Sequence, residues 1–183
     1  MKGCPIQPRA WKSTDAAAAA KDFFRRCRKP QARKAAVREL ISELCSDDPF
    51  DHRCAAEFAR LVSRREPGIL AAYGDVLAQV AAELPMEEWQ ARGYVIVAAA
   101  HNATTRPQRM RLLPLVRTRL AEDRTAVRAM ALEALAILAA HEPELRDEAM
   151  EMLEEARHNS EPAMRARARL MLPIMLKAES QSR

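Results

Sequence analysis

Apolar side chains recur at the three- and four-residue spacing of helices along nearly the whole chain. This pattern predicts nine helices with short connections, which favour antiparallel neighbours. We expect the helices near residues 15–29, 32–45, 50–64, 67–84, 86–102, 107–121, 125–141, 143–158 and 161–178. Helix 125–141 is apolar on nearly all sides, so we expect neighbouring elements to cover it on several sides.

Internal repetition is visible in the spacing of the prolines. Pro67, Pro107 and Pro143 follow one another at intervals of 40 and 36 residues, and each opens an apolar-periodic segment. Aligning these prolines superimposes apolar residues at helical spacing: Tyr73, Leu113 and Ala149; Val76, Val116 and Met152; Val80, Leu120 and Ala156. The helices that alternate with these segments carry a small residue at one fixed level: Ala56, Gly93, Ala131 and Ala168. A small side chain at a fixed level lets neighbouring helices approach closely.

Helix pairs of 36–40 residues in which an aspartate precedes Val-Arg and then Ala resemble the HEAT repeat family. The best match runs from Asp123 through Val127-Arg128 and Ala131 to Leu135, and the repeat that follows has Met164-Arg165 at the Val-Arg position. The resemblance covers roughly residues 30–178. It implies an all-α fold, a right-handed α-solenoid of about four and a half antiparallel helix pairs. It also implies that the first helix of each pair lies on the convex side and the second on the concave side.

We expect a single helical-repeat domain over residues 13–178, with a flexible N-terminal tail at 1–12 and a C-terminal tail at 179–183. Composition agrees with an all-helical protein, because aromatic residues make up only 4% and glycines number four. No two glycines are close enough to form a phosphate-binding loop. No secretory signal is expected, and no uncharged run is long enough to span a bilayer.

No catalytic or metal-binding arrangement of residues is apparent, and we expect neither enzyme chemistry nor a cofactor. The four histidines fall near predicted helix ends, where a structural role is the simpler interpretation. The four cysteines form no Cys-x-x-Cys pair, which makes a structural zinc site improbable. We interpret them as free thiols of a cytoplasmic protein.

Charge is distributed unevenly along the chain. Residues 1–45 carry eleven basic and four acidic side chains, whereas residues 121–183 carry nine and twelve. The sharpest basic cluster is Arg25, Arg26, Arg28, Lys29, Arg33 and Lys34. Such a cluster can follow a phosphate backbone, and it can equally be the polar outer face that the end of a solenoid needs for solubility.

The expected concave side provides a second candidate site. The second-helix positions that line it are Asp75, Gln79, Arg111, Arg119, Asp147, Glu151 and Glu155. We expect Arg119 to pair with Glu155, and Arg111 to pair with Asp147, across neighbouring helices. Charges that line a groove commonly determine partner choice.

These observations predict a non-catalytic interaction or scaffold module that binds a protein partner through its curved surface. The alternative is a nucleic-acid-binding protein that uses the basic N-terminal helices. HEAT-like repeats also build alkylpurine DNA glycosylases, although the similarity is to the fold only. The apolar final helix is compatible with a homodimer formed through terminal helices, and its apolar residues are Leu170, Met171, Leu172, Ile174, Met175 and Leu176.

Overall fold

The structure is a computed structural model, and it describes residues 16–46, 48–159 and 161–180. Within these residues the chain forms nine α-helices, three short 3-10 turns and no strand, which confirms the all-α prediction. The expected tail at 1–12 lies outside the described residues. The last helix ends at Ser180 rather than at 178, so it includes the first residues of the expected C-terminal tail.

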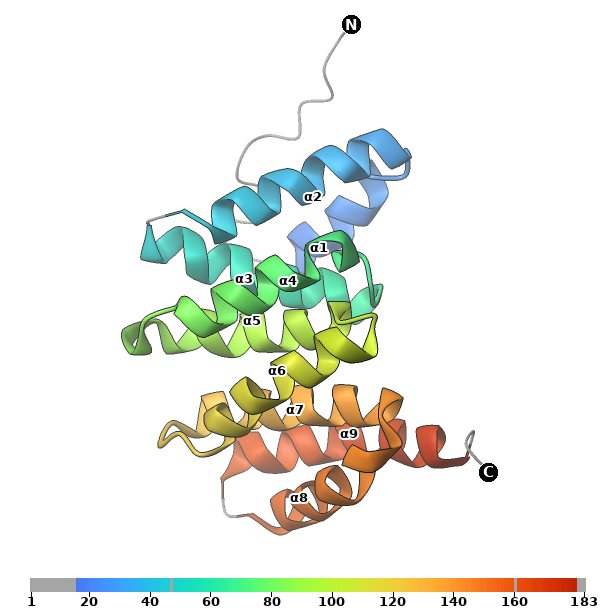
Figure 1. Ribbon diagram of the computed structural model, residues 1–183. Coiled ribbons are helices and arrows are strands. Elements are labelled where there is room, and N and C mark those ends of the chain that lie inside the picture. The colour runs from blue at the N-terminus through green and yellow to red at the C-terminus, as the bar shows by residue number, and fades with distance from the viewer. Residues whose placement is uncertain (1–15, 47, 160, 181–183) are drawn as a thin grey trace, which may run out of the picture.

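The helices alternate between two layers, and consecutive helices run in opposite directions (Figure 1). One layer contains α1 (Ala16–Arg26), α3 (Pro49–Arg65), α5 (Trp89–Asn102), α7 (Thr125–His141) and α9 (Pro162–Ser180). The other contains α2 (Pro30–Leu44), α4 (Gly74–Glu83), α6 (Arg106–Leu120) and α8 (Arg146–His158). We refer to these as the odd layer and the even layer. Helices of the odd layer pack closely against one another from α1 to α9, whereas contacts between helices of the even layer are sparse.

The predicted helix starts at 67, 86 and 143 are all too early, and the error is largest for the helix at 67–84. Gly68 adopts a φ of +83°, in the left-handed region that glycine tolerates best, and so it turns the chain after α3. A 3-10 turn, η2 (Ala71–Tyr73), follows, and α4 begins only at Gly74. Similar turns precede α5 at η3 (Met86–Glu88) and α8 at η4 (Pro143–Leu145).

The core is centred on α5 and α7, which have almost no solvent-facing side. All of residues 91–100 except Tyr94, and all of residues 129–139, are buried. The small residues at the repeated level are buried, and at Gly93 an added Cβ would lie 2.6 Å from the Met130 sulfur, as the expected close approach of helices requires. The close approach of α5 to α7 therefore depends on the missing side chain at Gly93.

A buried asparagine joins three segments at the carboxyl end of α5. Asn102 is 0% exposed, and its Oδ1 accepts a hydrogen bond of 2.7 Å from the backbone N–H of Leu70. Its Nδ2 donates to the Ala98 carbonyl and to Ser63 Oγ, at 2.7 and 2.8 Å. One side chain thus satisfies the buried amide of the turn before α4 and connects it to both α3 and α5.

Basic side chains connect successive helices of the odd layer. Each of the segments that lead into α5, α7 and α9 carries a glutamate, and a basic residue of the preceding odd helix contacts it. The pairs are His52 Nδ1–Glu88 Oε2 at 2.7 Å, Arg92–Glu122 at 2.5 Å and Arg128–Glu161 at 2.6 Å. These contacts fix the start of each odd helix against the helix before it.

Three arginines make the same pair of contacts at different places in the chain. Arg33, Arg109 and Arg128 each donate to the carbonyl six residues earlier, and each pairs with a glutamate 33 residues later. The glutamates are Glu66, Glu142 and Glu161. Each of these arginines is the fourth residue of its helix, so helices of both layers, α2, α6 and α7, start with the same contacts.

No helix among the described residues combines the length and the apolar character needed to cross a bilayer.

We expect Asn102→Ala to lower the free energy of unfolding by about 2–4 kcal/mol, because it leaves the buried Leu70 amide and Ser63 hydroxyl without a partner. Ser63→Ala is the matched control, since it removes one of these hydrogen bonds, and it should cost about 1 kcal/mol. Urea unfolding monitored by circular dichroism measures both values. Equal effects for the two variants would contradict the central role of Asn102.

We expect Glu142→Gln to destabilise the protein by about 3 kcal/mol, because it breaks a buried ion pair and leaves Arg109 uncompensated. Asp75→Asn breaks the exposed Arg111–Asp75 pair of similar length and should cost less than about 1 kcal/mol. Chemical denaturation of both variants under the same conditions tests the difference. A loss at Asp75 as large as that at Glu142 would refute this assignment.

Candidate functional site

Most of the predicted partner-binding residues lie on the exposed surface of the even layer. Asp75, Gln79, Arg111, Asp147, Glu151 and Glu155 are all exposed, on α4, α6 and α8. Arg119 is the exception, because only 6% of it is exposed. The predicted row is therefore a surface feature of the even layer except at Arg119.

Neither of the two ion pairs expected on this side is the pair that forms. Arg119 donates to Glu122 at 2.7 Å and to the Ala81 carbonyl at 3.0 Å, so it joins α6 to the end of α4. Arg111 instead pairs with Asp75, at 2.7 Å. The physical reason is the direction of the contacts: these arginines of α6 reach back toward α4, and the expected pairs required them to reach forward to α8.

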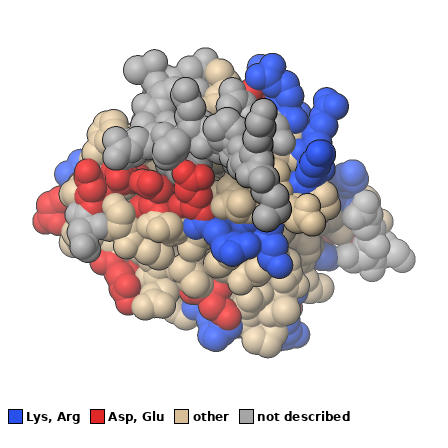
Figure 2. All heavy atoms as spheres, turned by 90° about the horizontal axis from the view of Figure 1, so that it is seen from above, with Lys and Arg blue, Asp and Glu red and all other residues tan. Residues whose placement is uncertain are grey.

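The N-terminal basic cluster is partly used in structural contacts. Arg33 pairs with Glu66 at 2.6 Å, and Arg25 pairs with Asp22. Arg28, Lys29 and Lys34 are exposed, whereas the side chain of Arg26 lies outside the described part of the structure. In the view onto this end of the molecule, Lys and Arg gather at the upper right and Asp and Glu chiefly at the left (Figure 2).

The final helix is only partly available as an interface. Met171, Leu172 and Met175 are buried in the core, and Leu170, Ile174 and Leu176 are exposed. Half of the apolar residues that suggested a homodimer therefore stabilise the fold of the chain itself.

A charged cluster on the odd layer was not predicted. Glu133 is the only acidic residue of α7, and it is only 1% exposed. Its carboxylate lies 3.3 Å from Nε of Arg64 on α3 and 2.8 Å from a guanidinium nitrogen of Arg167 on α9. Arginines from the odd helices on both sides thus converge on one buried carboxylate. We call Arg60, Arg64, Glu133 and Arg167 the Glu133 cluster.

Arg60, one turn before Arg64 on α3, is the most unusual member of the cluster. It is 9% exposed, and its guanidinium carbon lies 5.0 Å from the centre of the Tyr94 ring. Its buried Nε has no hydrogen-bond partner. Burial lowers the pKa of Arg60, the Glu133 carboxylate raises it, and the charges of Arg167 and Arg64 lower it. Arg60 is therefore a buried cation that the described part of the protein compensates only through Glu133 and an aromatic ring.

His101 lies beside the cluster at the end of α5. Burial is the largest cause that lowers its pKa from 6.5 to about 4, and the positive charges of Arg64, His141 and Arg60 act in the same direction. At neutral pH the imidazole is therefore uncharged. The sequence placed His101 only near a helix end and did not indicate that it lies close to arginines of α3.

The cluster supplies positive charge, hydrogen-bond donors and one aromatic face. Two guanidinium groups contact a single carboxylate and a third, that of Arg60, interacts with it electrostatically, so the cluster has an excess of positive charge at neutral pH. Such a surface suits recognition of an anionic group. The sequence contained one usable signal, an isolated glutamate inside a helix that is otherwise apolar between Arg128 and His141.

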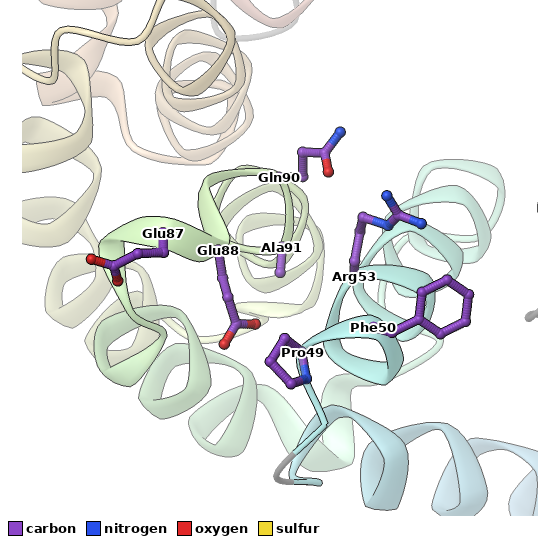
Figure 3. A pocket seen from close by; sticks show the side chains of 7 residues that line it. All are labelled: Pro49, Phe50, Arg53, Glu87, Glu88, Gln90 and Ala91. Carbon is purple, nitrogen blue, oxygen red and sulfur yellow. The ribbon is translucent and has the colours of Figure 1, made fainter.

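A cavity of about 230 Å³ lies between the first turn of α3 and the segment that leads into α5. Figure 3 shows Glu88 extending toward Pro49, with Phe50 and Arg53 together on the α3 side. The Arg53 guanidinium lies 5.3 Å from the centre of the Phe50 ring, and Glu88 is held by His52. Arg53 and Glu88 of this cavity therefore already have contacts within the protein.

A larger cavity, of about 360 Å³, lies between the end of α2, the start of α3 and α4. Its walls combine apolar side chains such as Leu44 and Val80 with His52 and Glu83. No group of three or more His, Cys, Asp or Glu side chains is placed to hold a metal ion in the described ranges. Cys27, Cys45 and Cys54 carry free thiols.

Comparisons of the chain with protein-family models, with curated proteins and with solved structures found no match.

We expect His101 to make the stability of the protein depend on pH. Its folded-state pKa of about 4 lies below the unfolded value near 6.5, so only the unfolded chain binds a proton between these values. The stability contributed by neutral His101 is present above pH 6.5 and is lost as the pH falls toward 4. The loss should be about 3 kcal/mol, because one pKa unit corresponds to about 1.4 kcal/mol.

The measurement is the free energy of unfolding from pH 7.5 to pH 4 for the parent protein and for His101→Gln. The variant should lose less stability on acidification by about that amount, whereas His158→Gln, at an exposed histidine of α8, should follow the parent curve. Parallel curves for the parent and His101→Gln would show that His101 does not cause the dependence.

Proposed function

We propose that the chain is a non-catalytic α-solenoid of HEAT-like helix pairs that binds a protein partner through one face of the stack. The observation that carries this proposal is the contact that recurs between successive odd helices, from His52 to Glu88, from Arg92 to Glu122 and from Arg128 to Glu161. A chain built from one repeated unit stacks its units in a row, and such stacks offer an extended surface to partners.

We infer that the odd layer forms the inner side of the stack. When two layers of helices bend together, the layer whose helices lie closer is on the inside of the bend, and here that is the odd layer. This assignment is the reverse of the one that the HEAT resemblance implied, in which the second helices formed the concave side. It moves the proposed partner surface from α4, α6 and α8 to the odd layer, where accessible side chains come from α3 and α9, such as Arg64 and Arg167, and from Tyr94 of α5.

The Glu133 cluster supports this choice of face. It brings side chains of four successive odd helices together, since Arg60 and Arg64 come from α3, Tyr94 from α5, and Glu133 and Arg167 from α7 and α9. Arginine and tyrosine are common at the energetic centres of protein interfaces. On the even layer, by contrast, the exposed Arg111 is paired with Asp75.

The nucleic-acid alternative rests on the exposed Arg28, Lys29 and Lys34 at the N-terminal end. Within that cluster Arg33 and Arg25 already pair with carboxylates of the chain, which leaves a smaller basic surface than the sequence suggested. We therefore favour a protein partner.

Site-specific photo-crosslinking tests the proposed face. A benzoylphenylalanine at position 94, on the odd layer, should give a defined adduct that excess unlabelled protein abolishes. The same group at position 79, exposed on α4, is the matched control and should give none. Arg60→Glu should eliminate the adduct at position 94, because it reverses a charge at the centre of the face. An adduct only from position 79 would refute the choice of face, and sustained turnover of a substrate would refute the non-catalytic role.

A further inference from the structure

We propose that the Glu133 cluster is a binding site for a phosphate monoester group, held by the guanidinium groups of Arg60, Arg64 and Arg167. This inference deepens the proposed function and rests on it, because it names the chemistry that a partner presents to the odd layer.

The first argument is the balance of charge. Arg64 and Arg167 contact the Glu133 carboxylate from two sides, and Arg60 interacts electrostatically with all three. Three positive charges against one negative charge leave an excess of two. A phosphate monoester carries a charge of about −1.5 to −2 at pH 7, which matches this excess.

The second argument is the state of Arg60. A cation that is nine-tenths buried normally has an ion pair or several hydrogen bonds, because losing its water is costly. Within the described ranges Arg60 has neither, and its Nε is without a hydrogen-bond partner. An oxyanion bound beside it would supply the missing compensation.

The third argument concerns access and orientation. The side chains of Arg64 and Arg167 are 33% and 21% exposed, so a ligand in solvent can reach the cluster at these two residues. Ion pairs with Glu133 hold these two guanidinium groups in place, and the guanidinium group of Arg60 lies over the Tyr94 ring. The donors are therefore positioned before a ligand arrives, which reduces the entropy lost on binding.

A purely structural role accounts for only part of the cluster. Arg64 and Arg167 hold α3 and α9 against Glu133 of α7, and one carboxylate forms ion pairs with both. Arg60 forms no ion pair with Glu133 and so does not help to hold these helices together. The third guanidinium is the group that the fold leaves unexplained and that a bound anion explains.

The chemistry favours a phosphate monoester over a carboxylate or a nucleic-acid backbone. A carboxylate neutralises one positive charge, and each phosphodiester of a nucleic acid carries one negative charge, whereas the monoester dianion neutralises both. Clusters of arginines recognise phosphate groups through planar, paired donors.

The test is isothermal titration calorimetry of the whole chain with O-phosphoserine and with inorganic phosphate, with free glutamate as the carboxylate comparison. We expect saturable binding of both phosphates and at least about tenfold weaker binding of glutamate. Binding should weaken from pH 7.5 to pH 5.5, because the second phosphate pKa is about 6. His101 remains neutral over this range and does not contribute.

Arg60→Met retains an unbranched stem over Tyr94 and should weaken phosphoserine binding by about tenfold or more while the helical circular dichroism is preserved. Arg167→Lys keeps the charge but loses the paired donors, and it should weaken binding by a smaller factor. Arg38→Gln, at an exposed arginine of α2, is the matched control and should bind as the parent does. Equal affinity of Arg60→Met and the parent would overturn the proposal, as would a parent protein that binds neither phosphate.

Duplex DNA forms the last arm of the experiment. Strong salt-dependent binding of DNA that Arg60→Met abolishes, with no binding of phosphoserine, would overturn the monoester site in favour of a nucleic-acid surface. Failure of phosphoserine to bind while the crosslinked adduct at position 94 persists would refute this inference alone. Phosphoserine binding without any adduct would refute the proposed function and leave the anion site in place.

Discussion

The burial of α5 and α7 on all sides is the constraint on which the rest of the structure depends. Both helices lie between odd-layer neighbours and beneath the even layer, so nearly every position on them faces protein. Such a helix must approach its neighbours closely, which the glycine at 93 permits, and its buried polar side chains need compensating partners. Asn102 meets this demand by bridging to α3 and to the turn before α4. Glu133 meets it by drawing in arginines from α3 and α9.

The same constraint explains how the chain uses its many arginines. A long side chain with a planar head can reach from one helix to the loop of the next, and Arg92, Arg109 and Arg128 do so with distances of 2.5–2.6 Å to glutamates. Much of the positive charge is therefore consumed in fixing neighbouring units, including Arg33 of the basic N-terminal cluster. A count of basic residues along the sequence consequently overstates the surface charge available to a polyanion.

The sequence predicted the helices well because apolar periodicity and prolines mark them directly, and its small residues at one level indicated the close helix packing that is seen at Gly93. It missed the late start of α4, since a left-handed turn at Gly68 leaves no periodic signal. Arg119 was placed wrongly because helical spacing gives the face of a residue but not the neighbour toward which a flexible side chain reaches. The Glu133 cluster was missed because it joins three helices whose contributing residues, Arg64, Glu133 and Arg167, lie more than 30 residues apart, and only the fold brings them together.

The arrangement around Glu133 also separates what folding requires from what binding requires. Buried ion pairs contribute little net stability compared with apolar residues of similar volume, so a fold gains little by adding a third guanidinium to a carboxylate that already has two. A methionine at position 60 would pack over Tyr94 without the desolvation that a buried cation suffers. Stability alone therefore gives no reason for arginine at this position, whereas recognition of an anionic group does. Arg60 is thus the member of the Glu133 cluster that the packing of the helices does not need, and it links the fold of this chain to the proposed binding of an anion.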